Sequence, residues 1–355
     1  MSTRTLLFAS ALLLAGIPAS AAGLGGEIDT TVIGTIDGGD NMSADIWNRV
    51  RLNLLLPSTG RTSARFDVDI FRAGGASDFF IRSLYVRRRF DFAHRTLGRQ
   101  PVSWAFGSIF NPVDFTLGAE IADVERADKF RDAINLYIPL AWNAGVSFTG
   151  AFTDEDIKSG ARVRFGLGGY DLSANFIHEP AGTSPDFERD RSRAGAAFKG
   201  DLGPLGFYGA LGATFQPGEE SGISGVIGTD YSFTLRGMHP VLIQAEYLSL
   251  APGIAGEITG GAPEERTVNT GILAGNLNFG LDDFTSIGLL AVVFTDDDGV
   301  VLAPYLETDL GEGLLLNLRG GYLRGERVAL FGQTVFEEEV EPVKGIIQAV
   351  LSYHF

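Results

Sequence analysis

The chain has 355 residues, of which 45% are hydrophobic, and it carries a formal net charge of −16. The hydrophobic content argues against a disordered chain, and the acidic charge argues against nucleic-acid binding, which requires a basic surface. The sequence contains no cysteine, so disulfides do not contribute to the stability of the fold.

Residues 1–21 are expected to form a cleaved secretory signal peptide. Arg4 precedes an apolar run from Leu6 to Ile17, and small residues at Ala19 and Ala21 fit the small-x-small cleavage pattern. The apolar run is shorter than the roughly 20 residues that a membrane-spanning helix needs, which favours a signal peptide over an anchor. Residues 22–355 are then expected to form a single domain.

From residue 26 onward, apolar side chains recur at every second position, which is the period of a β-strand. In the stretch "IWNRVRLNLLL", Val50 and Leu52 share one face, whereas Arg49 and Arg51 share the other. The same alternation occurs in "SARFDVDIF" (63–71), "WNAGVSFTGAF" (142–152), "ARVRFGL" (161–167), "GVIGTDYSFTLRG" (225–237) and "LLLNLRGGY" (314–322).

Short and long connections alternate between these strands, which is typical of an antiparallel up-and-down meander whose two rims differ. Counting from residues 26–36 to the last strand gives about eighteen strands. Because 26–36 and 95–101 are weak strand signals, sixteen is the alternative. A helix over 133–153 is the competing interpretation of that uncharged stretch, but Pro139 near its middle favours a hairpin that turns there.

The polar face determines the environment of the sheet. An arginine on the lipid side at the midplane of a bilayer costs roughly 2–4 kcal/mol, so the strand arginines are expected to face the interior of a closed transmembrane barrel. They are Arg49, Arg51, Arg65, Arg162, Arg164, Arg193, Arg236 and Arg319. A soluble sandwich would need a drier core than these residues allow. Arg87, Arg88 and Arg89 are consecutive, so the faces of their strand stay unassigned; an outward arginine there could extend to the lipid headgroups.

The last eleven residues, "GIIQAVLSYHF", alternate and end on phenylalanine. This ending resembles the C-terminal signature of Gram-negative outer-membrane proteins, and the whole meander is similar to porin-type barrels. The resemblance implies that the cell outer membrane is the location and that Tyr353 and Phe355 are an assembly signal for the barrel-assembly machinery. It also implies contact with outer-membrane lipid and lipopolysaccharide, and it is compatible with a homotrimer.

The connection over 101–130 is long and half apolar, and it looks similar to the third loop of porins, which folds into the barrel and forms a constriction. The alternatives are a surface lid and an interface with a neighbouring subunit. The residues assigned to this constriction loop are Trp104, Asp114, Glu120, Asp123, Glu125 and Asp128. Asp114 closes the stretch "NPVD", which predicts a tight turn.

A basic wall is expected to face that loop, and it comprises Arg49, Arg51, Arg65, Arg99, Arg162 and Arg164. The alternative for each arginine is a structural ion pair with a neighbouring carboxylate such as Asp67 or Asp69. The sequence therefore predicts a porin-like channel for passive diffusion of small hydrophilic solutes, with a weak preference for anions. The alternatives are a narrow or plugged barrel with a structural or adhesive role, and a substrate-specific sugar transporter. The scattered histidines predict no enzyme, metal site or cofactor.

Overall fold

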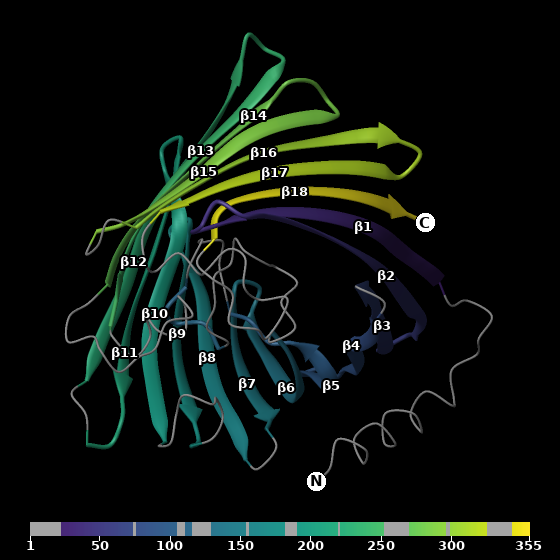
Figure 1. Ribbon diagram of the computed structural model, residues 1–355. Helices are drawn as coiled ribbons and strands as arrows, with labels where there is room; N and C mark the ends of the chain where they lie inside the picture. The colour runs from purple at the N-terminus through teal and green to yellow at the C-terminus, as the bar shows by residue number, and fades with distance from the viewer. Residues whose placement is uncertain are drawn as a thin grey trace.

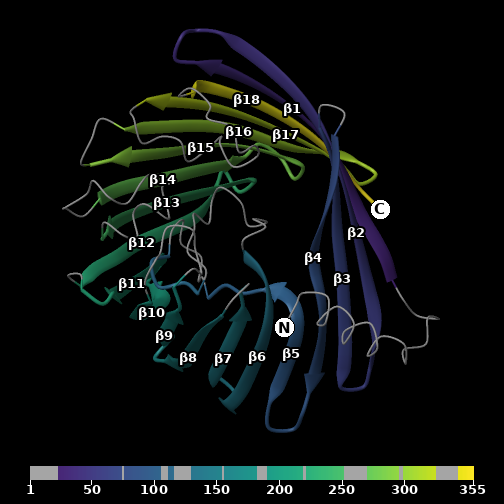
Figure 2. The same ribbon diagram turned by 60° about the horizontal axis from the view of Figure 1, so that its bottom comes forward.

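The computed structural model describes residues 23–73, 76–104, 111–115, 129–153, 156–181, 190–218, 221–251, 270–295, 299–324 and 343–355. These residues form one antiparallel sheet of eighteen strands, in which each strand pairs with its neighbours in sequence. The sheet closes because β18 pairs with β1 as well as with β17. Figures 1 and 2 show the result as a continuous wall with the C-terminal strand beside the N-terminal one. The predicted eighteen-stranded barrel is confirmed.

The first nine strands are β1 (Gly23–Asp37), β2 (Met42–Thr59), β3 (Thr62–Ala73), β4 (Ala76–Arg89), β5 (His94–Pro101), β6 (Phe130–Ala141), β7 (Ala144–Phe152), β8 (Ile157–Leu167) and β9 (Tyr170–Glu179). The other nine are β10 (Arg191–Leu202), β11 (Leu205–Phe215), β12 (Gly222–Leu235), β13 (His239–Leu250), β14 (Thr270–Gly280), β15 (Thr285–Phe294), β16 (Val300–Gly311), β17 (Leu314–Arg324) and β18 (Val343–His354). Residues 1–21, which the sequence predicts to be a signal peptide, lie outside the described residues.

The two rims of the barrel differ in the length of their connections. On the rim that also holds both ends of the barrel, eight turns of two to four residues join the strands. One of these turns corrects the sequence interpretation: β6 continues through Pro139 to Ala141, and the hairpin turns at Trp142 and Asn143. A register shift between Pro139 and Ala141 accommodates the proline, which cannot donate a backbone hydrogen bond.

The outer face of the wall is mostly apolar. On β8, for example, Val163 and Phe165 are exposed on the outside, whereas Gly160, Arg162 and Arg164 share the inner face. The chain ends on the same outer face, where the rings of Tyr353 and Phe355 are exposed and lie 6.4 Å apart between centroids. Apolar groups outside and charged groups inside are the arrangement of a barrel embedded in lipid.

A β-bulge determines the faces of β4, the strand with three consecutive arginines. Asp67 pairs with Ser83 and Val68 pairs with Ile81, so Arg82 is the extra residue on β4. An extra residue reverses the alternation. Ile81 therefore shares the outer face with Leu84 and Arg88, although these numbers differ in parity, and Arg87 lies on the inner face.

The facing of β8 is open to a direct test, because the chain lacks cysteine and a single one can be introduced. We expect Arg164→Cys to react with a membrane-impermeant thiol reagent that reaches the barrel interior from water, and Phe165→Cys to be protected by lipid. The yield of labelled protein in reconstituted vesicles measures both. A lipid-soluble thiol reagent should label Phe165→Cys more than Arg164→Cys. Equal labelling of the two variants by the impermeant reagent would contradict the assignment of Arg164 to the inner face and Phe165 to the outer face.

Candidate functional site in the barrel interior

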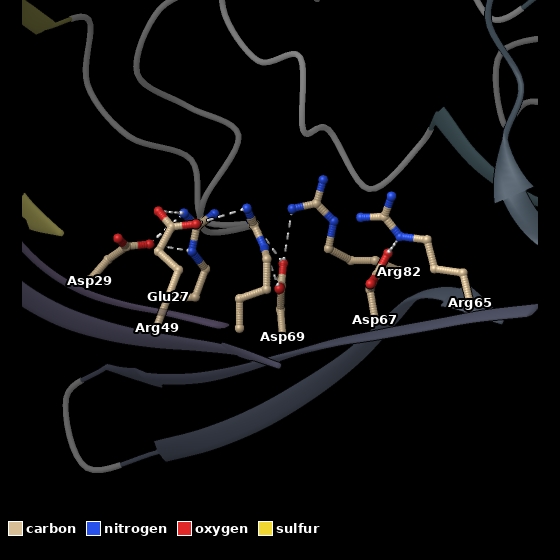
Figure 3. Close-up of polar contacts among 8 residues, drawn as sticks. Glu27, Asp29, Arg49, Arg65, Asp67, Asp69 and Arg82 are labelled. Carbon is tan, nitrogen blue, oxygen red and sulfur yellow. Dashed lines mark hydrogen bonds and ion pairs between the residues drawn. The ribbon is translucent and has the colours of Figure 1, made fainter. Parts of the chain in front are cut away.

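The inner faces of β1, β2, β3 and β4 carry a row of alternating charges, which we call the charged ladder (Figure 3). It consists of Glu27, Asp29, Arg49, Arg51, Arg65, Asp67, Asp69 and Arg82. Cross-strand register builds it, because Arg49 stands opposite Asp29 and Arg51 stands between Glu27 and Asp69. The ladder thus follows from alternation on neighbouring strands.

The ladder is linked by short polar contacts. Arg49 Nε donates to Asp29 Oδ2 at 2.6 Å, and Arg51 bridges two strands, with Nη1 3.1 Å from Glu27 Oε2 and Nε 2.9 Å from Asp69 Oδ1. Asp69 also faces Arg82 at 3.5 Å. Because four guanidinium groups meet four carboxylates, the ladder is close to electrically neutral.

Arg65 completes the ladder and is its most accessible cation. Its Nε donates to Asp67 Oδ2 at 2.5 Å, yet its side chain is 46% exposed. The structural ion pairs considered for Arg51 and Arg65 are therefore present, and they leave little excess positive charge on this wall.

A hollow of about 240 Å³ lies against the ladder. Its polar lining includes Glu27, Arg51, Asn53, Arg65, Asp67 and Arg82. Among the described residues, the buried oxygens Oδ1 of Asp67 and Oδ1 of Asn53 have no hydrogen-bond partner. Guanidinium donors beside free acceptors form a surface that suits solutes rich in hydroxyl or amide groups.

Arg99 does not join the ladder. In the register of β5 and β6 it pairs with Asp132, on the face opposite to Gln100 and Ala133, and Ala133 belongs to a lumen-side cluster. Its guanidinium lies 4.7 Å from the centroid of the Phe80 ring and 3.7 Å from Asp132 Oδ2. Arg99 thus fills the seam beside β4 rather than the wall of the pore.

The described pieces of the 101–130 connection contact the inner wall. Asn111 and Asp114 enclose the predicted turn, with Asp114 N donating to Asn111 O at 3.3 Å. The Asp114 carboxylate ties this turn to the end of β5, because it accepts hydrogen bonds from Ser103 Oγ and from the backbone of Trp104 and Phe115. The two pieces, 102–104 and 111–115, therefore form one hydrogen-bonded unit.

This unit lies against β8, β9 and β10. Asn175 Nδ2 donates to the carbonyl of Val113, and the Trp104 and Phe115 rings pack edge to face at 5.2 Å. A Cβ at Gly160 would come within 2.8 Å of Trp104, so the glycine provides the space for the indole. Glu120, Asp123, Glu125 and Asp128 lie outside the described residues, and the constriction that they would form stays a prediction.

A buried cluster around Glu179 holds this unit in place, and the sequence analysis did not identify it. Glu179 accepts hydrogen bonds from Arg191 Nε at 2.7 Å and Arg193 Nε at 3.1 Å, and it pairs with Lys158. Arg193 then donates to the carbonyl of Asp114 at 2.8 Å and to that of Phe115 at 3.1 Å. The alternation of Arg191 and Arg193 was a visible signal, but their shared partner was not.

The inner faces of β8, β9 and β10 hold more cations than carboxylates. The residues on these faces are Lys158, Arg162, Arg164, Arg191, Arg193 and Lys199, with Asp171, Glu179 and Asp201. Arg162 pairs with Asn175 in the register and Arg164 with Ser173, so neither has a carboxylate directly opposite on β9. The excess positive charge of the described wall is therefore here rather than on the ladder.

The interior is not polar everywhere, which corrects the simple inside–outside pattern. Inward-facing Leu248, Ile272, Val292 and Val301 form part of a buried apolar cluster on β13 to β16, near the rim of the long connections. The stretch "LLAVVF" at 289–294 is apolar at both parities, which was the available sequence signal. This corner of the barrel is filled by side chains.

Comparisons with solved structures place the fold among outer-membrane barrels, although no family model and no curated protein matches the chain. The chain is similar to OccAB3 of Acinetobacter baumannii, with a TM-score of 0.60, 11% identity and coverage of 95% of this chain and 99% of that one. It is also similar to Wzi, a carbohydrate-binding barrel involved in group 1 capsule assembly in Escherichia coli. That comparison has a TM-score of 0.61, 13% identity and coverage of 100% of this chain and 89% of that one. A mutant of the Rh. blastica porin is similar with a TM-score of 0.50, 10% identity and coverage of 94% of this chain and 100% of that one.

The Glu179 cluster generates a stability prediction. Glu179→Gln leaves Lys158, Arg191 and Arg193 without their shared counter-charge, and breaking such a buried pair costs about 3–5 kcal/mol. Urea-induced unfolding of the reconstituted barrel measures this cost. The control is Glu307→Gln, because Glu307 has one neutral partner, Asn317, at 3.2 Å; we expect a change within about 0.5 kcal/mol. Similar losses in the two variants would refute the role of the cluster.

Proposed function

We propose that this protein is a porin-like channel through which small hydrophilic solutes cross the outer membrane by passive diffusion. The observation that carries the proposal is the charged interior of a closed eighteen-stranded wall, with a polar hollow beside the ladder. Water-exposed guanidinium groups such as that of Arg65 support an aqueous path along this wall, since a dry core would not leave charges solvated. A barrel of this strand number is wide enough for an aqueous channel.

Within this proposal, anions pass more readily than cations. The neutral ladder adds little to such a preference, so the wall of β8 to β10 supplies it through Arg162, Arg164 and Lys199. The residues at 111–115 lie against the same wall, which brings passing solutes close to these cations. A homotrimer and the recognition of Tyr353 and Phe355 by the barrel-assembly machinery remain predictions from the sequence.

The second candidate is a narrow or plugged barrel with a structural or adhesive role. The apolar cluster on β13 to β16 favours it, because inward-facing Leu250, Ile272, Val292 and Phe294 are at most 1% exposed. Buried apolar residues at one rim reduce the cross-section of the barrel that water can occupy. The two candidates differ in whether a continuous aqueous path exists.

Single-channel recording separates these candidates. We expect the purified protein, inserted in a planar bilayer, to give open steps of constant size whose conductance rises with salt concentration. A folded barrel migrates differently before and after heating on a denaturing gel, which verifies each sample. Silent bilayers from folded protein would reject the channel and support the plugged barrel.

The anion preference has its own test at Arg164. We expect Arg164→Glu to shift the reversal potential under a salt gradient toward cation selectivity, because the substitution changes the local charge by two units in an excess of cations. Arg236→Glu makes the same change of charge in a turn at the short-turn rim, and we expect a much smaller shift. If both variants shift the potential equally, the β8 to β10 wall does not determine selectivity.

A further inference from the structure

Two neighbouring turns on the short-turn rim gather arginines in a chain that is acidic overall. The turns at residues 60–61 and 90–93 bring together Arg61, Arg88, Arg89 and Arg95, all of them exposed. Asp91 is their one carboxylate partner in the described part of the chain, and it pairs with Arg61 at 2.7 Å. This basic patch takes no part in the proposed channel.

Arg88 and Arg95 stand directly opposite each other on β4 and β5. They lie two residues along their strands from Val86 and Leu97, which pair with each other on the outer face. Arg88 and Arg95 therefore point away from the lumen. Like charges in this position repel each other and destabilise a sheet. No carboxylate of the described residues pairs with either; Arg88 lies 5.4 Å from the centroid of the Phe90 ring. An anion from outside the chain would relieve this repulsion.

An apolar groove begins beside this pair. The register neighbour of Arg95 on β6 is Leu136, and Leu136 lines a groove of about 410 Å³ on the outer wall. Its lining comprises Ile134, Leu136, Phe148, Gly150, Ala161 and Phe176, together with Thr149, Ser159 and Gly160. Gly150 and Ala161 leave the space between the two phenylalanines, so the groove is shaped for a slender apolar chain.

We propose that Arg88 and Arg95 bind the phosphate of an anionic phospholipid and that the groove holds one of its acyl chains. The basic pair lies at the level of the short turns, where exposed Phe90 and Phe92 stack at 6.2 Å between centroids and mark the membrane interface. Short turns face the periplasm, so the lipid belongs to the inner leaflet of the outer membrane. A guanidinium group can donate two parallel hydrogen bonds to a phosphate. A free phosphate would leave the apolar groove empty, whereas a phospholipid fills both parts of the site.

Native mass spectrometry of the detergent-purified protein tests the site with synthetic phosphatidylglycerol and phosphatidylethanolamine of identical chains. We expect tighter binding of phosphatidylglycerol, and we expect Arg88→Gln with Arg95→Gln to weaken it by about 30-fold, since each basic group near an anionic lipid contributes about fivefold. The control, Arg236→Gln with Arg319→Gln, removes the same charge from another turn and from the inner face and should leave binding unchanged.

Two further arms identify the ligand. Ala161→Phe fills the groove without contacting the arginines. It should weaken the binding of both lipids but leave the preference of the protein for phosphatidylglycerol unchanged. Inorganic phosphate at a tenfold excess should fail to displace the lipid. Equal binding of the two lipids to the unmodified protein, or equal losses in the two double variants, would overturn the proposal. If the Arg88 and Arg95 double variant does not fold, the first comparison still decides.

Discussion

The pairing of β1 with β18 is the constraint on which the rest of the structure depends. Hydrocarbon offers no hydrogen-bond partner to a free strand edge, so a sheet in a membrane must close on itself. Here the first and last strands meet in register from Glu27 opposite His354 to Ile36 opposite Gly345, and Phe355 exchanges backbone hydrogen bonds with Gly26. Once the sheet is closed, each strand has one face toward lipid and one toward the interior, and the alternation of the sequence determines which residues occupy them.

Enclosing charges inside the wall has a consequence of its own. A charge removed from bulk water needs partners, and the two sides of the barrel satisfy this need differently. On β1 to β4 every arginine of the ladder has a carboxylate within 3.5 Å. On β8 to β10 one buried carboxylate, Glu179, serves three cations, and Arg193 directs its remaining donors to the carbonyls of the 111–115 turn. The excess charge thus helps to fix a segment from a distant part of the chain.

The sequence was sufficient for the barrel and insufficient for the details of its interior. Period-two alternation and the final phenylalanine predicted the closed meander, because facing is a local property of a strand. Ion pairs between strands depend on register, so Arg51 could be placed inside but its partners Glu27 and Asp69 could not be distinguished from other carboxylates. Arg99 was grouped with the ladder because its strand adjoins the 101–130 connection, but its ion pair is with Asp132 on β6. The bulge at Arg82 reversed the parity of β4 without a sequence signal. The residues of the predicted constriction after 115 lie outside the description.

In the proposed channel, the distribution of charge would also determine where ions are discriminated. The alternating charges of a balanced ladder cancel within a few ångströms, whereas an excess of one sign extends over about 8 Å, the Debye length at physiological ionic strength. A solute in the middle of a wide lumen would be screened from both walls. Val113 and Phe115 lie on the β8 to β10 wall, through Asn175 and Arg193, and reduce the width there. The turn held by the Glu179 cluster therefore lies beside the cations, so in the proposed channel charge and width would act on a solute at the same place.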